Sequence, residues 1–399
     1  MLRRYSRSGL EQGKNLMTSR FASIECLRVF AIFTVILAHT NFVANLSQLA
    51  DGRFLVRLSG YLVSDMGVPY FFITAGYFFR QSISAGGNPV AQFRRYVFPL
   101  AWMLLGWMCI YIVTPPYWPA EVFHQGWWQP FFAEALKNMH LLADKNISLF
   151  LEGKRPVWHL WFLPALMCGL ATLTLVAIYR LERYLVPLII SLYVLALTEE
   201  IAGGYFFNFT IHLGLWITAP LFTAIGWWLA GREQLSVAVA CSLIVGGYAV
   251  ALMEGAVIHA MSPSSQQAMY RHHFLGEIVL NIGIFTLAIA KPALGRSTPF
   301  PFLAQFTLGV YLSHIFVLYT VQGPISLILG TGIPLRGAIV AVIVYVFSVL
   351  FTLVLIRIPI LRYLVVKPAA RHKRKASEDP LTDKSLLDHS RSSIPPHAA

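Results

Sequence analysis

The stretch 336–357 carries no charged residue between Arg336 and Arg357, and nine other stretches of similar length share its apolar character. A helix of about 20 apolar residues spans the hydrocarbon core of a bilayer, whereas a transmembrane barrel needs short strands of alternating polarity. The chain is 57% hydrophobic and 12% charged, and soluble domains carry about 25% charged residues. We therefore expect an all-α, polytopic membrane helix bundle of about ten transmembrane helices. The expected spans are 24–43, 61–79, 97–113, 158–178, 185–202, 209–230, 235–254, 272–290, 302–322 and 336–357.

The basic residues are distributed unevenly between the loops. If the N-terminus is cytoplasmic, 22 of the 31 Lys and Arg residues fall on the cytoplasmic side and 8 fall outside. The positive-inside rule favours this topology, with both termini cytoplasmic, and it accounts for the net charge of +13 without nucleic-acid binding. We expect a basic cytoplasmic segment over 1–23, a membrane domain over 24–357 with a long outer loop at 114–157, and a basic, disordered cytoplasmic tail over 358–399.

The outer loop carries Trp118, Trp127 and Trp128, which are typical of the aromatic belt at a membrane interface. Residues 130–143 could form a short helix that lies on the membrane. Such a helix would be either a passive cover or a lid over a binding site.

Arg28 and His39 lie within the first predicted span, where an ordinary membrane anchor would carry neither. They are eleven positions apart. This separation is three helical turns plus about 20°, so both side chains share one face about 16 Å apart. Polar groups inside a span normally face a bundle interior or a wet cavity and mark a functional path. The structural alternative is an Arg that reaches the interface and a His that bonds a neighbouring helix.

Charged residues also accompany later spans. Arg94 and Arg95 precede the third span, where they either mark the cytoplasmic side or bind the phosphates of a cytosolic ligand. Glu277 lies in the eighth span, with His273 and Asn281 four residues to either side on the same helical face. This pattern indicates either a functional acid or a structural hydrogen bond to Asn281.

Two histidines occur in the fourth and ninth spans. His159 lies between Trp158 and Trp161, which fits an interfacial residue, while Tyr311 and His314 share one face near the middle of the membrane. These residues could converge with Arg28, His39 and Glu277 in one bundle. The four cysteines occur singly, and the chain contains no HExxH, CxxC, GxSxG or Walker-type glycine loop. We expect no disulfide framework and no metal site.

Taken together, the motifs resemble the integral-membrane acyltransferase 3 family. Its signature is an Arg, ten residues and then a His in the first helix, which Arg28 and His39 match; Glu25 stands where the family usually has Asp. The segment G-V-P-Y-F-F-I-T-A-G-Y-F at 67–78 is similar to the second-helix motif. The later motifs that resemble the family are Arg94, Arg95 and Pro99, then W-H-L-W-F-L at 158–163 and L-G-V-Y-L-S-H at 308–314. The resemblance covers roughly 22–357.

The chain also departs from the family pattern. Cys26 and Val29 stand where glycines often flank the Arg, and Ala75 stands where Ser is common. The fourth helix lacks the W-S-L-x-x-E form, so no catalytic Glu is assigned there. The chain resembles the stand-alone O-acetyltransferases that act on sugars or polysaccharides.

The resemblance implies a function. An acyl group, most simply acetyl, would pass from cytosolic acyl-CoA to a hydroxyl of a cell-surface polysaccharide or lipid-linked sugar, in the bacterial cytoplasmic (inner) membrane. His39 would be the general base or a carrier of the acyl group, and Arg28 would orient the donor or stabilise charge on the thioester oxygen. Arg94 and Arg95 would hold the CoA phosphates. The supporting or acceptor-side residues would be Glu25, Glu277, Tyr311, His314 and His159.

Other interpretations stay open at this point. A proton-coupled transporter that uses Arg28, His39 and Glu277 as a relay would move its substrate without acyl-CoA. Within the enzyme class, the donor could carry succinyl or a longer chain, and the acceptor could be an antibiotic, peptidoglycan or an oligosaccharide. The expected partners are the acceptor glycan and membrane lipid, and a homo-oligomer is compatible with the sequence.

Overall fold

The computed structural model describes residues 21–49, 54–116, 118–126, 128–143, 155–201, 217–233, 235–261, 274–329, 333 and 335–365. These residues form helices and short connections, with no β-strand among them, so the all-α prediction is confirmed. The predictions for 1–20, for the tail from 366 on, for Trp127, for His273 and for the first part of the span 209–230 lie outside the described residues.

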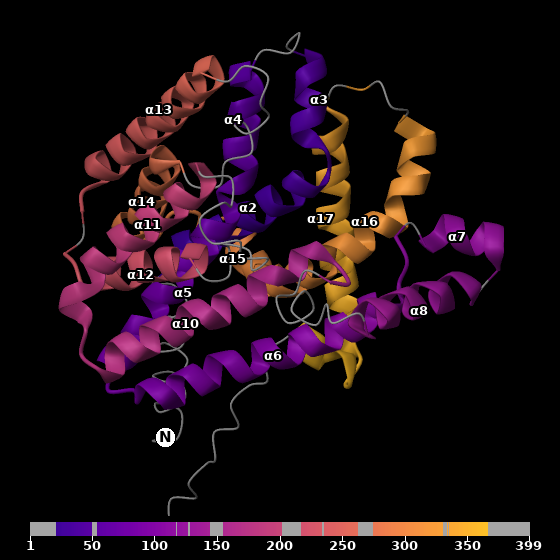
Figure 1. Ribbon diagram of the computed structural model, residues 1–399, viewed down its shortest axis with the longest axis horizontal. Coiled ribbons are helices and arrows are strands. Elements are labelled where there is room, and N and C mark those ends of the chain that lie inside the picture. The colour runs from indigo at the N-terminus through magenta and orange to yellow at the C-terminus, as the bar shows by residue number, and fades with distance from the viewer. Residues whose placement is uncertain are drawn as a thin grey trace, which may run out of the picture. The chain divides into compact units, whose positions relative to one another are not determined.

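The helices are labelled in Figure 1 in chain order. The N-terminal half contains α2 (Ala22–His39), α3 (Phe42–Leu49), α4 (Phe54–Asp65), α5 (Gly67–Ser84), α6 (Pro89–Val113), α7 (Trp118–Gln125), α8 (Gln129–Ala143), η1 (Trp158–Trp161), α10 (Phe162–Ile178), η2 (Glu182–Tyr184) and α11 (Leu185–Ile201). The C-terminal half contains α12 (Ala219–Ala230), α13 (Val237–Met261), α14 (Leu275–Ala290), α15 (Phe300–Leu303), η5 (Ala304–Phe306), α16 (Thr307–Leu329), α17 (Arg336–Arg357) and η6 (Leu361–Leu364).

Many of these helices are long enough to cross a membrane. Each predicted span overlaps a helix, while the count of ten and the side on which the termini lie stay predictions. Shorter apolar helices in the described part are Ala219–Ala230 and Leu275–Ala290. Seven segments of the described chain have both the length and the apolar composition for a span, namely Ala22–His39, Phe54–Ser84, Pro89–Val113, Trp158–Ile178, Val237–Met261, Phe300–Leu329 and Arg336–Arg357.

Helix α2 packs against many of the other helices. It contacts α4, α5, α14, α15, α16 and α17, and it is buried over most of its length. Neighbouring helices bind it near its N-terminal end: the Tyr70 hydroxyl of α5 donates to the Ile24 carbonyl at 3.1 Å, and the Ser23 hydroxyl donates to the Ala288 carbonyl of α14 at 2.6 Å. The C-terminal end of α2, at His39, is exposed.

Small residues allow neighbouring helices to approach backbone to backbone. A Cβ atom added at Gly76 of α5 would overlap the carbonyl of Thr223 on α12, and one added at Gly226 would overlap the carbonyl of Ile73 on α5. Because lipid is as apolar as the helices themselves, transmembrane helices associate through close packing and polar contacts. The contact between α5 and α12 therefore depends on these two glycines.

Helices α7 and α8 pack on α6 and α16. The Trp118 indole N–H of α7 donates to the Thr320 hydroxyl of α16 at 3.1 Å, and the Asn138 amide of α8 donates to the Ile112 carbonyl of α6 at 2.9 Å. Helix α8 contains the predicted helix 130–143, which is confirmed. Its position on the membrane surface stays a prediction.

Replacing Gly76 with Val should push α5 away from α12, because the new Cβ overlaps backbone that cannot move freely. Overpacking an interior contact costs about 1–3 kcal/mol, so we expect a lower midpoint of thermal unfolding in detergent. The matched control is Gly246→Val on α13, where an added Cβ meets nothing within 4 Å. Equal midpoints for the two variants would contradict the importance of this contact.

Candidate functional site

The imidazole of His39, the last residue of α2, lies beside an imidazole of α16. The centroids of the His39 and His314 rings are 5.3 Å apart. His39 is exposed, whereas the His314 side chain is 0% exposed. One side of this pair is therefore open to a ligand, and the other side is enclosed by the bundle.

A hydrogen bond assigns the tautomer of His314. Its Nδ1 lies 2.6 Å from the backbone carbonyl oxygen of Tyr311. A carbonyl only accepts hydrogen bonds, so Nδ1 carries the proton and Nε2 of the neutral ring carries a lone pair. Nε2 is buried and makes no hydrogen bond within the described residues. The free lone pair thus belongs to the ring that neighbours His39.

A third histidine completes the cluster. The centroids of the His159 and His314 rings are 4.9 Å apart, and the ring of Tyr111 lies 5.2 Å from that of His159. The Tyr311 hydroxyl donates to the backbone carbonyl of His159. The interpretation of His159 as an interfacial residue stays a prediction, and the structure buries this side chain, which is only 2% exposed. The structure brings His39, His159, Tyr311 and His314 together.

Arg28 lies nearer the other end of α2 and forms an ion pair. Its Nη1 lies 3.0 Å from a carboxylate oxygen of Glu25, and its Nη2 donates to the Thr307 hydroxyl of α16 at 3.3 Å. The Arg28 and Glu25 side chains remain 30% and 31% exposed. Arg28 and His39 both face α16, so the prediction that they share one face of the helix is confirmed.

The face of α2 between these two residues is closed. Ile32 and Val35 occupy the helical positions that connect Arg28 to His39, and both are buried in the core. The Arg28 end and the His39 end are therefore two separate accessible places on one helix.

Most of the chain matches a known protein family. A family model described as an acyltransferase domain, acyltransferase 3, matches residues 21–357. The chain belongs to this acyltransferase family. No curated protein and no solved structure matches it. Family membership and the long apolar helices together make it a multi-pass membrane protein.

Glu277, which the sequence placed with the site, lies on a different helix of this acyltransferase. The histidine cluster is built from α2, η1 and α16, whereas Glu277 is buried near the start of α14. Its neighbour Gly276 packs on Ala251 of α13. The Asn281 amide donates to the backbone carbonyl of Glu277 at 3.0 Å, so the predicted structural bond exists but reaches the backbone of Glu277.

Arg94 and Arg95 are exposed in the first turns of α6. The adjacent ring of Tyr96 lies 5.8 Å from Phe79 of α5, and the ring of Phe21, just before α2, lies 5.6 Å from Phe78. Neighbouring residues of α5 thus bind the arginine-bearing turn of α6 and the start of α2. The two arginines and the Arg28 end of α2 consequently lie toward the same end of α5.

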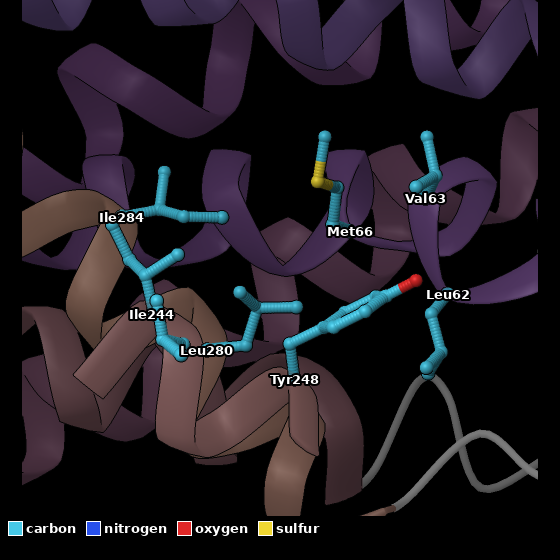
Figure 2. A pocket seen from close by; sticks show the side chains of 8 residues that line it. Leu62, Val63, Met66, Ile244, Tyr248, Leu280 and Ile284 are labelled. Carbon is cyan, nitrogen blue, oxygen red and sulfur yellow. The ribbon is translucent and has the colours of Figure 1, made fainter. Parts of the chain in front are cut away.

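An apolar cavity of about 320 Å³ lies between α4, α13 and α14 of this acyltransferase. Figure 2 shows its aliphatic lining together with the ring of Tyr248. Such a lining suits an alkyl chain better than a sugar or a nucleotide. The lining residues are Leu62, Val63, Met66, Ile244, Val245, Tyr248, Leu280 and Ile284.

Two residues at the site were missed in the sequence. Thr307 accepts a hydrogen bond from Arg28, and Tyr111 donates one to the Leu312 carbonyl at 2.9 Å. A hydroxyl at the start of a predicted span gives no sign of which residue it meets. Tyr111 lies deep in the third predicted span, and a buried Tyr needs a partner for its hydroxyl. This requirement was the one feature of the sequence that could have indicated a role for Tyr111.

The different exposure of the three histidines predicts their reactivity. Diethylpyrocarbonate, which acylates accessible imidazoles, should modify His39 in the folded protein and leave His314 and His159 unmodified, because both are buried. Peptide mass spectrometry after a short exposure measures this. Modification of His314 as fast as His39 would show that the enclosed side of the cluster is open. Denatured protein, in which all three sites should react, is the control.

Proposed function

We propose that this protein is an O-acyltransferase that moves an acyl group, most simply acetyl, from cytosolic acyl-CoA to a hydroxyl of a cell-surface polysaccharide or lipid-linked sugar. One observation carries the proposal: an accessible imidazole, His39, lies against a buried neutral imidazole, His314, whose tautomer is fixed. This arrangement suits general base catalysis on a weak nucleophile.

The neighbouring ring of His314 can orient the imidazole of His39. The Nε2 lone pair of His314 can accept the N–H of His39, which leaves the other nitrogen of His39 free toward the ligand. His39 takes the proton of the acceptor hydroxyl as its oxygen attacks the thioester carbonyl carbon. After the C–S bond breaks, His39 returns this proton to the departing sulfur. The positive charge that His39 carries between these steps is stabilised by the lone pair of His314.

The donor would enter from the Arg28 end. Guanidinium groups bind phosphates through paired hydrogen bonds, and Arg94 and Arg95 are exposed at the same end of α5 as the start of α2. Acyl-CoA supplies an activated thioester and several phosphate groups. The Arg28 guanidinium has five N–H groups, and its contacts with Glu25 and Thr307 leave some of them to orient the donor as it enters. Glu25 would hold Arg28 in place.

A proton-coupled transporter remains the rival. Its relay would need Arg28, His39 and Glu277 to exchange protons, yet Arg28 pairs with Glu25, and buried apolar residues separate Arg28 from His39 along α2. These contacts favour the transferase. Substrate flux into proteoliposomes without acyl-CoA, and no labelling by acyl-CoA, would favour the transporter.

Replacing His39 with Ala should abolish transfer from radiolabelled acetyl-CoA to a membrane glycolipid extract. Loss of a general base lowers the rate about 10²–10⁴-fold, whereas the alanine at an exposed helix end leaves the fold intact. The assay uses purified protein in nanodiscs, with insertion and monodispersity checked for each variant. The control variant is His259→Ala on α13, where the ring stacks on Phe54. Full activity of His39→Ala would remove His39 from the mechanism.

Replacing both Arg94 and Arg95 with Ala should weaken donor binding selectively. Each lost charge-assisted hydrogen bond costs about 1.5–3 kcal/mol, so the KM for acetyl-CoA should rise at least about tenfold while the KM for the acceptor stays within error. Initial rates at varied concentrations of each substrate measure the two values. The control is Arg183→Ala, an exposed Arg that lies over Tyr184. An unchanged donor KM would return Arg94 and Arg95 to the role of topology markers.

A further inference from the structure

A tyrosine hydroxyl from α6 lies inside the backbone of α16. The Tyr111 hydroxyl donates to the Leu312 carbonyl at 2.9 Å and accepts from the Phe316 backbone N–H at 3.1 Å. In a regular α-helix these two backbone groups bond to each other, since they are four residues apart. The hydroxyl is therefore a bridge between groups that normally pair directly.

The bridged turn is the one that carries His314. A side chain that inserts into the hydrogen-bond ladder opens and bends a helix locally. His314 lies between Leu312 and Phe316, so the direction of its ring depends on how far this turn is opened. The position of the Tyr111 hydroxyl thus contributes to where the His314 ring lies beside the ring of His39.

Other contacts tie His159 to the same turn. The carbonyl of Leu312 that accepts from Tyr111 also faces the His159 Nε2 at 3.4 Å. The Tyr111 ring meets the His159 ring edge-on, at 84° between the ring planes. One residue of α6 consequently supports both buried histidines of the cluster.

We propose that Tyr111 is a positioning residue for His314 and, through His314, for His39. This inference rests on the proposed transferase function. Tyr111 is fully buried with its ring against Trp107, at 5.5 Å between centroids, and its hydroxyl is used by the two backbone groups, so its role is to set geometry.

The variant Tyr111→Phe separates this role from general stability. It keeps the ring and its packing, and it lets the Phe316 N–H and the Leu312 carbonyl pair with each other directly, so no buried backbone group is left unsatisfied. We expect the unfolding midpoint to stay close to that of the wild type. The turn should close, and the His314 ring should move away from His39.

The first measurement is steady-state transfer by the full-length protein in nanodiscs. Misplacing a catalytic group by about 1 Å costs about 100-fold, so kcat of Tyr111→Phe should fall about 10- to 100-fold with the KM for acetyl-CoA and for the acceptor unchanged. The matched control is Tyr345→Phe, which removes a hydroxyl from a half-buried Tyr packed on Phe33 and should keep the wild-type kcat.

A double-mutant cycle with His314→Gln tests whether Tyr111 acts through His314. If it does, adding Tyr111→Phe to His314→Gln should have little further effect on kcat, because interacting residues are not additive. Full additivity of the two losses would overturn the proposal. An unchanged kcat in Tyr111→Phe would overturn it as well.

A second measurement, by NMR, does not depend on transferase activity. In protein labelled with ¹⁵N-histidine, the His314 ring signals are identified by their loss in His314→Gln. They should shift in Tyr111→Phe and stay in place in Tyr345→Phe. Unshifted His314 signals would overturn the positioning role even in an inactive preparation. Absence of transfer by the wild type together with a shift in these signals would instead reject the transferase proposal and the catalytic part of the role.

Discussion

The hydrogen bond between His314 Nδ1 and the Tyr311 carbonyl is the interaction on which the candidate site depends. It is local to one turn of α16. Because it holds the proton on Nδ1, it keeps Nε2 of the buried His314 ring as an acceptor. The surrounding contacts, from Tyr311 to His159 and from Tyr111 to Leu312, all hold this same turn. The accessible His39 therefore lies beside a ring, His314, whose tautomer is already fixed.

The rest of the bundle serves to hold α2 against α16. In lipid, this requires close helix contacts and satisfied polar groups. The start of α2 is held by Tyr70 and Ser23, and the backbones of α5 and α12 meet at Gly76 and Gly226. The contacts of Tyr70 and Ser23 restrain the rotation of α2 about its own axis. In this orientation of α2, Arg28 and His39 both face α16.

Much of this arrangement could be predicted from the sequence, because helical periodicity is a local property. The spans and the shared face of Arg28 and His39 follow from the spacing of apolar and polar residues alone. The burial of His159 and the bridge from Tyr111 could not be predicted, since both depend on which helices meet. Periodicity also gives no information on which neighbour a helix face meets, so the convergence of Glu277 with His39 stays a prediction.

The closed face of α2 has a consequence for the membrane itself. Ile32 and Val35 close the face of α2 between the Arg28 end and the His39 end. A wet path through the bundle would let protons run down the membrane potential, whose energy is about 2.3 kcal/mol per charge at 100 mV. The two aliphatic side chains carry no group that can pass on a proton, so this face of α2 provides no direct proton path between Arg28 and His39.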